Sequence, residues 1–181
     1  MIKRMTLLTM LLLVACGLVW ANPAPKTASG NSPMEGMKAA MMKCYVCKNV
    51  AAHMDEIGPM GMEAVQLNDG VEIRHWVVSS DPKKVAAFQA ACQACNKAGE
   101  VTMSWTDAQA KAELCGFCQG IRSAAKAGAH MSQGTTKKAD VMIITSSDAV
   151  VQAQLSGLQK QCEMMAASME APVSKTTAEK P

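Results

Sequence analysis

Aromatic residues are scarce in this chain, which has three tryptophans, two phenylalanines and one tyrosine among its 181 residues. A core assembled from large rings is therefore excluded, and the helices have to pack through small or flexible side chains. Sixteen methionines are available for this role, since methionine fills irregular gaps well but specifies one packing arrangement poorly. The length is sufficient for one domain or for two very small ones.

A large excess of charge of one sign is also missing. The 18 basic and 15 acidic residues give a formal net charge of +3, and removal of residues 1–21 would take away two basic residues and leave +1. Nucleic-acid binders and anionic-membrane binders carry a basic footprint that this balance does not provide. No later stretch approaches the roughly 20 apolar residues needed to span a bilayer. We therefore expect an unknown protein or small ligand as the partner, no nucleic acid, and no transmembrane span in the mature chain.

Several catalytic and cofactor motifs do not occur. The chain has no glycine-rich phosphate loop, no Gly-x-Ser-x-Gly and no His-Glu-x-x-His. No Cys-x-x-Cys is followed by histidine, which excludes covalent haem attachment through that motif. Two Ser-Ser-Asp triplets, 79–81 and 146–148, are explained by helix capping. We therefore expect a protein that is not an enzyme and needs no cofactor.

The first 21 residues predict export. A basic start at Lys3 and Arg4 is followed by an almost wholly apolar stretch, residues 6–20, as in a signal peptide. The small residues before Asn22 suit ordinary cleavage, so that residues 1–21 would be the signal peptide.

A second ending of this signal stays open. Residues 13–16 resemble the lipobox of bacterial lipoproteins, in which Cys16 would be lipidated and become the new N-terminus. Either ending predicts an exported protein, in the periplasm or outside the cell, and the second predicts a lipid anchor. Residues 22–31 are rich in Pro, Ala, Ser and Gly and predict a flexible linker, and residues 170–181 predict a disordered tail.

The body of the chain contains an imperfect repeat. The Cys-x-x-Cys motif at residues 44–47 is restated at residues 115–118. Each copy leads to a Ser-Ser-Asp triplet, and a further cysteine follows fourteen residues after its aspartate, Cys95 in the first copy and Cys162 in the second. This pattern predicts a duplication.

Both halves of this duplication, residues 32–99 and 100–169, predict the order helix, β-hairpin, helix from their caps, apolar periodicity and turn residues. Because one half would have a marginal core, we expect both hairpins in one sheet. The predicted fold is α+β, with an antiparallel four-stranded sheet and four helices, cross-linked by disulfides. The predicted helices are 33–57, 82–98, 105–127 and 149–169, and the predicted strands are 63–67, 71–79, 130–134 and 139–145.

Disulfide bonds are the first interpretation of the cysteines, because export leads to an oxidising compartment. If the two helices of each half run antiparallel, their cysteines lie at matching levels, and each bond would stabilise the domain by roughly 2–4 kcal/mol. The connectivity rests on the repeat alone. The predicted bonds are Cys44–Cys95, Cys47–Cys92 and Cys115–Cys162, with Cys118 left as the free thiol.

Metal binding is the second interpretation. Four thiolates can hold zinc tetrahedrally, and thioethers suit copper. The zinc candidates are Cys44, Cys47, Cys92 and Cys95. The copper candidates, by residue type and proximity in sequence, are Met60 with Met62, His53 with Met54, and His130 with Met131.

Thiol–disulfide redox chemistry is the third interpretation, because residues 115–118 have the spacing of redox pairs. Such pairs begin a helix, where the dipole lowers the thiol pKa. Here three helical turns are predicted to precede Cys115, so we expect that activation to be missing. The sequence thus favours an exported, cysteine-rich binding or structural protein of unknown ligand, with periplasmic metal binding and thiol–disulfide redox activity as alternatives.

Overall fold

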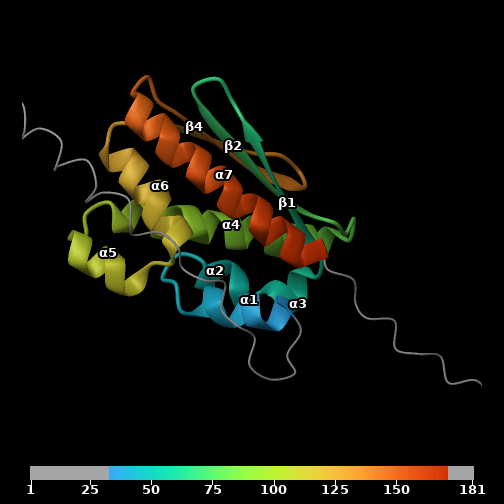
Figure 1. The fold of residues 1–181 in the computed structure, drawn as a ribbon. Helices are drawn as coiled ribbons and strands as arrows, with labels where there is room; N and C mark the ends of the chain where they lie inside the picture. The colour runs from blue at the N-terminus through green and yellow to red at the C-terminus, as the bar shows by residue number, and fades with distance from the viewer. Residues whose placement is uncertain (1–32, 171–181) are drawn as a thin grey trace, which may run out of the picture. The chain divides into compact units, whose positions relative to one another are not determined.

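The protein's structure, a computed structural model, describes residues 33–170. Two hairpins meet in one antiparallel sheet of order β1-β2-β4-β3 (Figure 1). This result confirms the predicted α+β class and the single four-stranded sheet. The strands are β1 (Met60–Gln66), β2 (Gly70–Val77), β3 (His130–Thr135) and β4 (Ala139–Thr145).

Seven helices occur in residues 33–170, so the prediction of four was wrong in number. The two predicted helices that contain residues 44–47 and 115–118 are broken at these motifs, whereas the helix that contains residues 92–95 is continuous. The helices are α1 (Pro33–Met42), α2 (Lys48–Ala51), α3 (Met54–Ile57), α4 (Pro82–Thr102), α5 (Asp107–Glu113), α6 (Gly116–Lys126) and α7 (Ala149–Glu170).

The first break has a specific cause. The Tyr45 backbone N–H donates to the Glu113 carbonyl at 2.9 Å, a bond to a distant segment that replaces the local helical bond. At the second break, Leu114 takes an extended conformation (φ −110°, ψ 142°) and ends α5. Apolar periodicity continues across both breaks, which is why the sequence suggested continuous helices.

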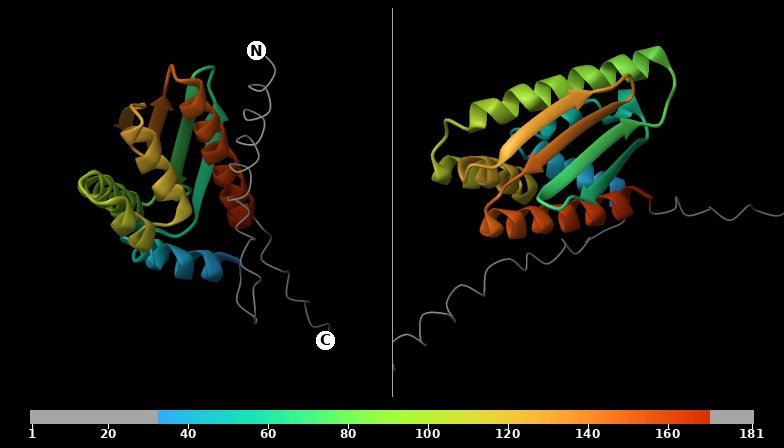
Figure 2. Two further views of the ribbon diagram at one scale, coloured as in Figure 1. Left: turned by 60° about the vertical axis from the view of Figure 1, so that its left-hand side comes forward. Right: turned by 90° about the horizontal axis from the view of Figure 1, so that it is seen from above.

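The helices cover one face of the sheet. Val71, Ile73 and Val77 of β2 point to that face and are at most 1% exposed. One core cluster joins the sheet to α6 and α7 through residues such as Leu155, and a second joins β2 to α3 and α4 through residues such as Phe88. In the view from above in Figure 2, the four strands lie side by side with no described helix drawn over them.

Close packing also fixes α6. A side chain at Gly120 would place its Cβ 2.6 Å from Leu158 Cδ2 of α7, so glycine permits this approach of the two helices. Gly128, with φ +89°, follows the end of α6 in the left-handed region, which glycine adopts without a steric cost.

The helix starts follow the sequence closely. The Asp81 carboxylate accepts from the Lys83 backbone N–H at 2.9 Å and caps α4, whose first residue is Pro82. α5 begins with a complete capping box between Thr106 and Gln109.

Other predictions of the sequence stay predictions. The signal peptide, Cys16 and the linker lie outside the described residues, as does residue 171 onward, whereas the tail's first residue, Glu170, ends α7. The halves share the predicted order of elements, but a duplication is not thereby confirmed. No described helix has the length and apolar character of a membrane span.

Candidate metal centre

The first Cys-x-x-Cys motif forms the turn between α1 and α2. Cys44 donates its backbone N–H to the Met41 carbonyl at 3.0 Å, and the Lys48 N–H bonds to the Cys44 carbonyl at 3.0 Å. Because Tyr45 is bonded to Glu113 at the end of α5, this turn is held directly against the segment that carries the second motif.

The second Cys-x-x-Cys motif begins α6. Cys115 is the N-cap residue, with extended φ −68° and ψ 162°, and Cys118 lies in the first helical turn. The Gln119 side chain donates to the Leu114 carbonyl at 2.7 Å and holds the junction between α5 and α6. The expectation that three helical turns would run unbroken into Cys115 is therefore wrong, and this thiol does lie at the positive end of a helix dipole.

The two turns bring four sulfur atoms together in what we call the four-thiol cluster. The Sγ atoms of Cys44, Cys47, Cys115 and Cys118 all lie within 4.8 Å of one another. Cys47 Sγ is 3.4 Å from Cys118 Sγ and 3.7 Å from Cys115 Sγ. A tetrahedral zinc ion with Zn–S bonds of about 2.3 Å requires sulfurs about 3.8 Å apart. The geometry of the four-thiol cluster therefore fits a single metal ion.

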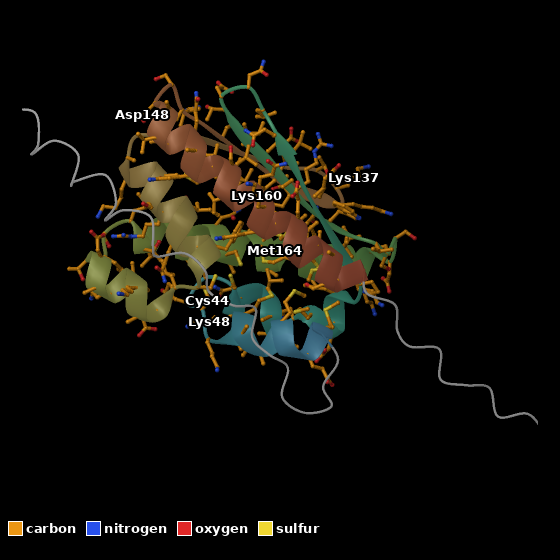
Figure 3. The ribbon with its side chains drawn as sticks, viewed as in Figure 1. Cys44, Lys48, Lys137, Asp148, Lys160 and Met164 are labelled. Atoms are coloured by element: carbon orange, nitrogen blue, oxygen red, sulfur yellow. The ribbon has the colours of Figure 1, made fainter. Side chains whose placement is uncertain are left out.

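The four-thiol cluster is partly shielded from solvent. Cys44 and Cys118 are 1% and 8% exposed, whereas Cys47 and Cys115 are half-buried. Figure 3 places Cys44, with Lys48 close by, beside the short helices at the bottom of the view. The two half-buried thiols give the cluster an edge through which a metal ion could enter.

The four thiols shift one another's pKa values. Hydrogen bonds from Cys115 and then Cys118 lower the pKa of Cys44, and a hydrogen bond from Cys118 lowers the pKa of Cys115. The contacts within the cluster raise the pKa of Cys47 and Cys118, chiefly through Cys115. Negative charge is thus favoured on two sulfurs while their neighbours keep protons. A cation would stabilise this charge and displace those protons.

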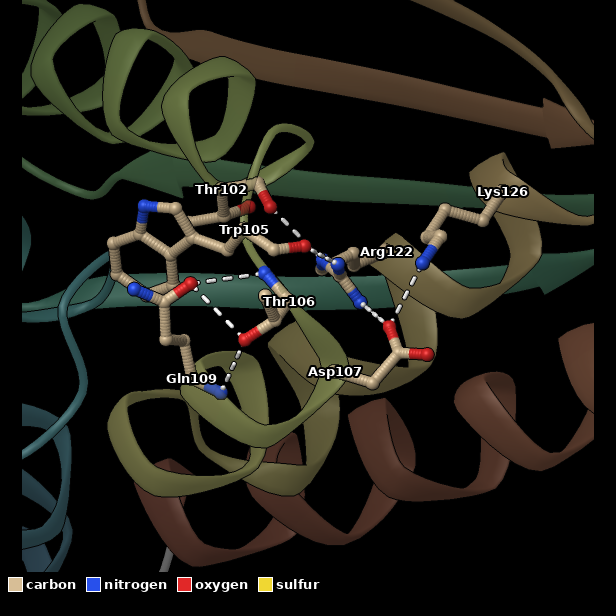
Figure 4. A network of polar contacts seen from close by, with 7 residues as sticks. All are labelled: Thr102, Trp105, Thr106, Asp107, Gln109, Arg122 and Lys126. Carbon is tan, nitrogen blue, oxygen red and sulfur yellow. Dashed lines mark hydrogen bonds and ion pairs between the residues drawn. The ribbon is translucent and has the colours of Figure 1, made fainter.

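A buried arginine holds the scaffold of the second motif (Figure 4). Arg122 lies one turn beyond Cys118 on α6 and is 6% exposed. Its Nε donates to the Thr102 carbonyl at 2.9 Å and its Nη1 donates to Asp107 Oδ1 at 2.8 Å. Its Nη2 donates to the Trp105 carbonyl. One side chain thereby joins the end of α4, the start of α5 and α6.

Lys126 adds a second cation to this network, since its Nζ lies 2.8 Å from the same Asp107 oxygen. Lys126 and then Arg122 lower the pKa of Asp107 to about 2. The sequence reasoning missed this network. Its signal is a charged residue, Arg122, four residues after Cys118 and hence on the same side of the helix.

Aromatic residues lie at the rim of the four-thiol cluster. The Tyr45 and Trp105 ring centroids are 4.8 Å apart with their planes tilted by 57°. Lys48 Nζ lies 4.6 Å from the centre of the Tyr45 ring, a cation–π contact. Both residues pack against the core cluster that contains Cys44 and Cys118 together with Ala110 and Leu114.

The predicted disulfides are not confirmed. The seven cysteines of residues 33–170 are free thiols, and Cys118, the residue predicted to lack a partner, lies among three other sulfurs. The prediction assumed continuous helices that would match Cys44 to Cys95 and Cys47 to Cys92. The break after α1 turns Cys44 and Cys47 toward the second motif instead.

The remaining cysteines occupy other environments. Cys92 packs in the apolar core near Phe88, and Cys162 of α7 is fully buried in another part of the core. Burial raises the pKa of both thiols to about 12. Cys95 donates its thiol to the Val46 carbonyl at 3.3 Å, next to the four-thiol cluster but outside it. Two of the four predicted zinc ligands, Cys44 and Cys47, therefore belong to the four-thiol cluster. The other two predicted ligands, Cys92 and Cys95, are replaced in the cluster by Cys115 and Cys118.

The copper candidates are spread over several elements. Met60 and Met62 lie on β1 and pack against different core clusters. His53 Nδ1 lies 3.4 Å from Glu56 Oε2 at the surface, and the adjacent Met54 is buried. His130 and Met131 lie on exposed β3. The structure does not bring these three pairs together in the way that it gathers the four thiols.

Comparison with protein-family models, curated proteins and solved structures finds no match for this chain. Its function is therefore argued from the chemistry of the four-thiol cluster.

Proposed function

We propose that this protein binds a metal ion, and that zinc is held by Cys44, Cys47, Cys115 and Cys118. The observation that carries the proposal is the convergence of four sulfurs within 4.8 Å from two segments far apart in sequence. Four thiolates suit zinc, which accepts tetrahedral sulfur coordination without a preference imposed by d-electrons.

Such a metal centre would have a structural role and not a catalytic one. Four protein ligands leave no open position for water or substrate, unlike the three-ligand arrangement of catalytic zinc sites. The metal would join the turn before α2 to the start of α6 and so fix the helices beneath the sheet. Metal binding is favoured here by a preformed site, whose thiol protons are released as the ion binds.

Metal analysis of the purified full chain tests this function. We expect one zinc per chain, and after its removal one Co²⁺ with the absorption of a tetrahedral thiolate site. Cys118→Ser should abolish stoichiometric binding, whereas Cys162→Ser, a buried thiol in another core cluster, should retain it. Absence of metal from the native chain and of Co²⁺ binding, or unchanged binding in Cys118→Ser, would contradict the proposal.

Thiol–disulfide exchange is the second candidate, favoured by Cys115 at the N-terminus of α6. The Cys115 thiolate would attack a disulfide substrate, R–S–S–R, release one R–S⁻ and form a mixed disulfide. Cys47, whose sulfur is 3.7 Å away, would then attack Cys115 Sγ and displace the second R–S⁻, which takes up the Cys47 thiol proton and leaves as R–SH, so that an intramolecular Cys47–Cys115 disulfide remains. Reduction of a disulfide substrate by the metal-free chain, lost in Cys115→Ser, would favour this candidate over zinc.

The predicted export bears on both candidates. An oxidising compartment favours disulfides between thiols as close as Cys47 and Cys118. We propose that bound metal prevents this oxidation when the protein is exported to the periplasm or outside the cell. A lipid anchor at Cys16 remains part of that proposal, and mass analysis of the mature N-terminus distinguishes it from cleavage before Asn22.

A further inference from the structure

The two edges of the sheet differ. α7 packs along β1, where the Ser156 hydroxyl donates to Gln66 Oε1 at 3.2 Å. β3 forms the other edge, and all six of its residues, His130–Thr135, are exposed. The nearby helix α4 is bonded instead to the turn after β3, through Gln89 and the Thr136 and Lys137 carbonyls.

Hydrogen-bond alternation shows which backbone groups of β3 point away from the sheet. The Thr136 N–H donates to the Ala139 carbonyl at 2.7 Å, so this pair is of the hydrogen-bonded type. In the register that pairs Thr135 with Asp140, every second residue of β3 bonds to β4. The alternate residues, Met131, Gln133 and Thr135, therefore direct their N–H and C=O groups outward.

We propose that β3 pairs antiparallel with β3 of a second copy of this chain, which joins two sheets into one of eight strands. A two-fold axis perpendicular to the sheet would place Gln133 opposite its own counterpart. Met131 of each copy would then lie opposite Thr135 of the other. This register pairs all three outward-directed residues and keeps each side chain on the same face as its opposite neighbour.

Charge favours a second copy over an unrelated strand. Residues 130–136 contain no Lys, Arg, Asp or Glu, so self-pairing brings no like charges together. The lysines of the following turn, Lys137 and Lys138, are exposed. Figure 3 shows Lys137 at the opposite end of the sheet from Asp148. Antiparallel pairing therefore carries the basic turn of each copy toward the end of the other copy that holds Asp148.

Natural proteins protect edge strands with charges, proline, bulges or covering segments. β3 has no charged residue or proline, and its register with β4 runs without a bulge. Because one short strand buries little surface, we expect a dimer that dissociates on dilution. The proposal is independent of the metal centre, since no cysteine lies on β3.

Sedimentation of the full chain over a concentration series tests the dimer. Met131→Pro removes an outward N–H without removing a bond to β4, whereas Met131→Ala removes the same side chain and keeps that N–H. Two hydrogen bonds are lost per dimer, so proline should weaken dimerisation about tenfold or more. Alanine should change it by less than about threefold.

A second variant tests the charge argument. Lys137→Glu with Lys138→Glu should weaken the dimer and reverse the effect of added salt on it.

A monomer at every concentration, equal loss in the proline and alanine variants, or association unaffected by Met131→Pro would overturn the proposal. Circular dichroism and metal content serve as controls. If both are unchanged in Met131→Pro, its loss of association does not arise from unfolding.

Discussion

Three Cys-x-x-Cys motifs of this chain have the same spacing but different backbones. Residues 44–47 form a turn, residues 115–118 begin a helix, and residues 92–95 lie inside the 21-residue helix α4. Only the first two contribute to the four-thiol cluster. Spacing alone therefore does not define a site here. The sulfurs converge where a break in the helix lets one motif face a second.

Metal removal should produce the largest difference between these motifs. If zinc joins the two turns, a chelator should lower the thermal midpoint of unfolding strongly, because binding to the folded state alone adds several kcal/mol at ~1,000 times the dissociation constant. The double variant Cys92→Ala with Cys95→Ala should be less stable at the start but show a similar chelator-induced shift. A shift lost in that variant would assign the metal to α4 instead.

The buried arginine beside the second turn should have the next largest effect. Arg122→Ala leaves the Trp105 carbonyl without its donor and removes one of the two donors to the Thr102 carbonyl, which keeps the Trp105 backbone N–H at 3.1 Å. We expect a loss of about 2–4 kcal/mol in the free energy of unfolding. Lys126→Ala is the matched control, because its ion pair with Asp107 is exposed and such pairs contribute about 0–1 kcal/mol. Chemical denaturation measures both. Equal effects would mean that Arg122 does not hold α6 in place.

Arg122 should also affect metal binding at the second Cys-x-x-Cys motif. If it positions α6, Arg122→Lys should weaken Co²⁺ binding and alter its absorption, because lysine lacks the planar group that reaches three acceptors. Lys126→Ala should leave the spectrum unchanged. A spectrum and affinity unaltered by Arg122→Lys would limit the role of Arg122 to general stability.

The thiols of the metal-free protein should differ in how fast they are alkylated. Burial raises the pKa of Cys92 to about 12 and that of Cys95 to about 11, so both stay protonated at neutral pH. Hydrogen bonding lowers the pKa of Cys115, which is half-buried at a helix start. We expect Cys115 to be modified first and Cys92 and Cys162 last, as peptide mass analysis can follow. Cys92 modified ahead of Cys115 would contradict the assigned environments.

The sequence was sufficient for the sheet and most helix starts. Asn68-Asp69-Gly70 predicted the first hairpin, and Asp81-Pro82 predicted the start of α4, because turn and cap residues act through local backbone geometry. The helix breaks at Cys44 and Leu114 were not predicted. The first break depends on the bond from Tyr45 to Glu113, which joins residues far apart in sequence.

The site shows the same limit. Of the four ligand candidates, the sequence proposed only Cys44 and Cys47 for zinc and assigned Cys115 to a disulfide and Cys118 to a free thiol, because the repeat suggested that each half pairs its own cysteines. In the structure the cysteines of residues 44–47 instead lie next to those of residues 115–118, because these two motifs face each other where the two halves of the chain meet. Periodicity records which side of a helix is apolar, but it does not record where a tertiary hydrogen bond interrupts that helix.

The smallest predicted effect concerns Asp107, which supports the second turn and has no counterpart identified at the first. Lys126 and then Arg122 hold its pKa near 2, below the ordinary value of 3.8. A carboxyl with a depressed folded-state pKa adds stability that is fully present above its unfolded pKa and is lost as pH falls toward the folded pKa. Asp107→Asn should therefore destabilise the metal-free protein slightly at about pH 6 and progressively less from about pH 5 to about pH 2. Because the carboxylate is exposed, its contribution is screened and should shrink further in high salt. Urea denaturation of both proteins across this range measures the difference, and a difference that grows on acidification would show that Asp107 is not held by these two cations.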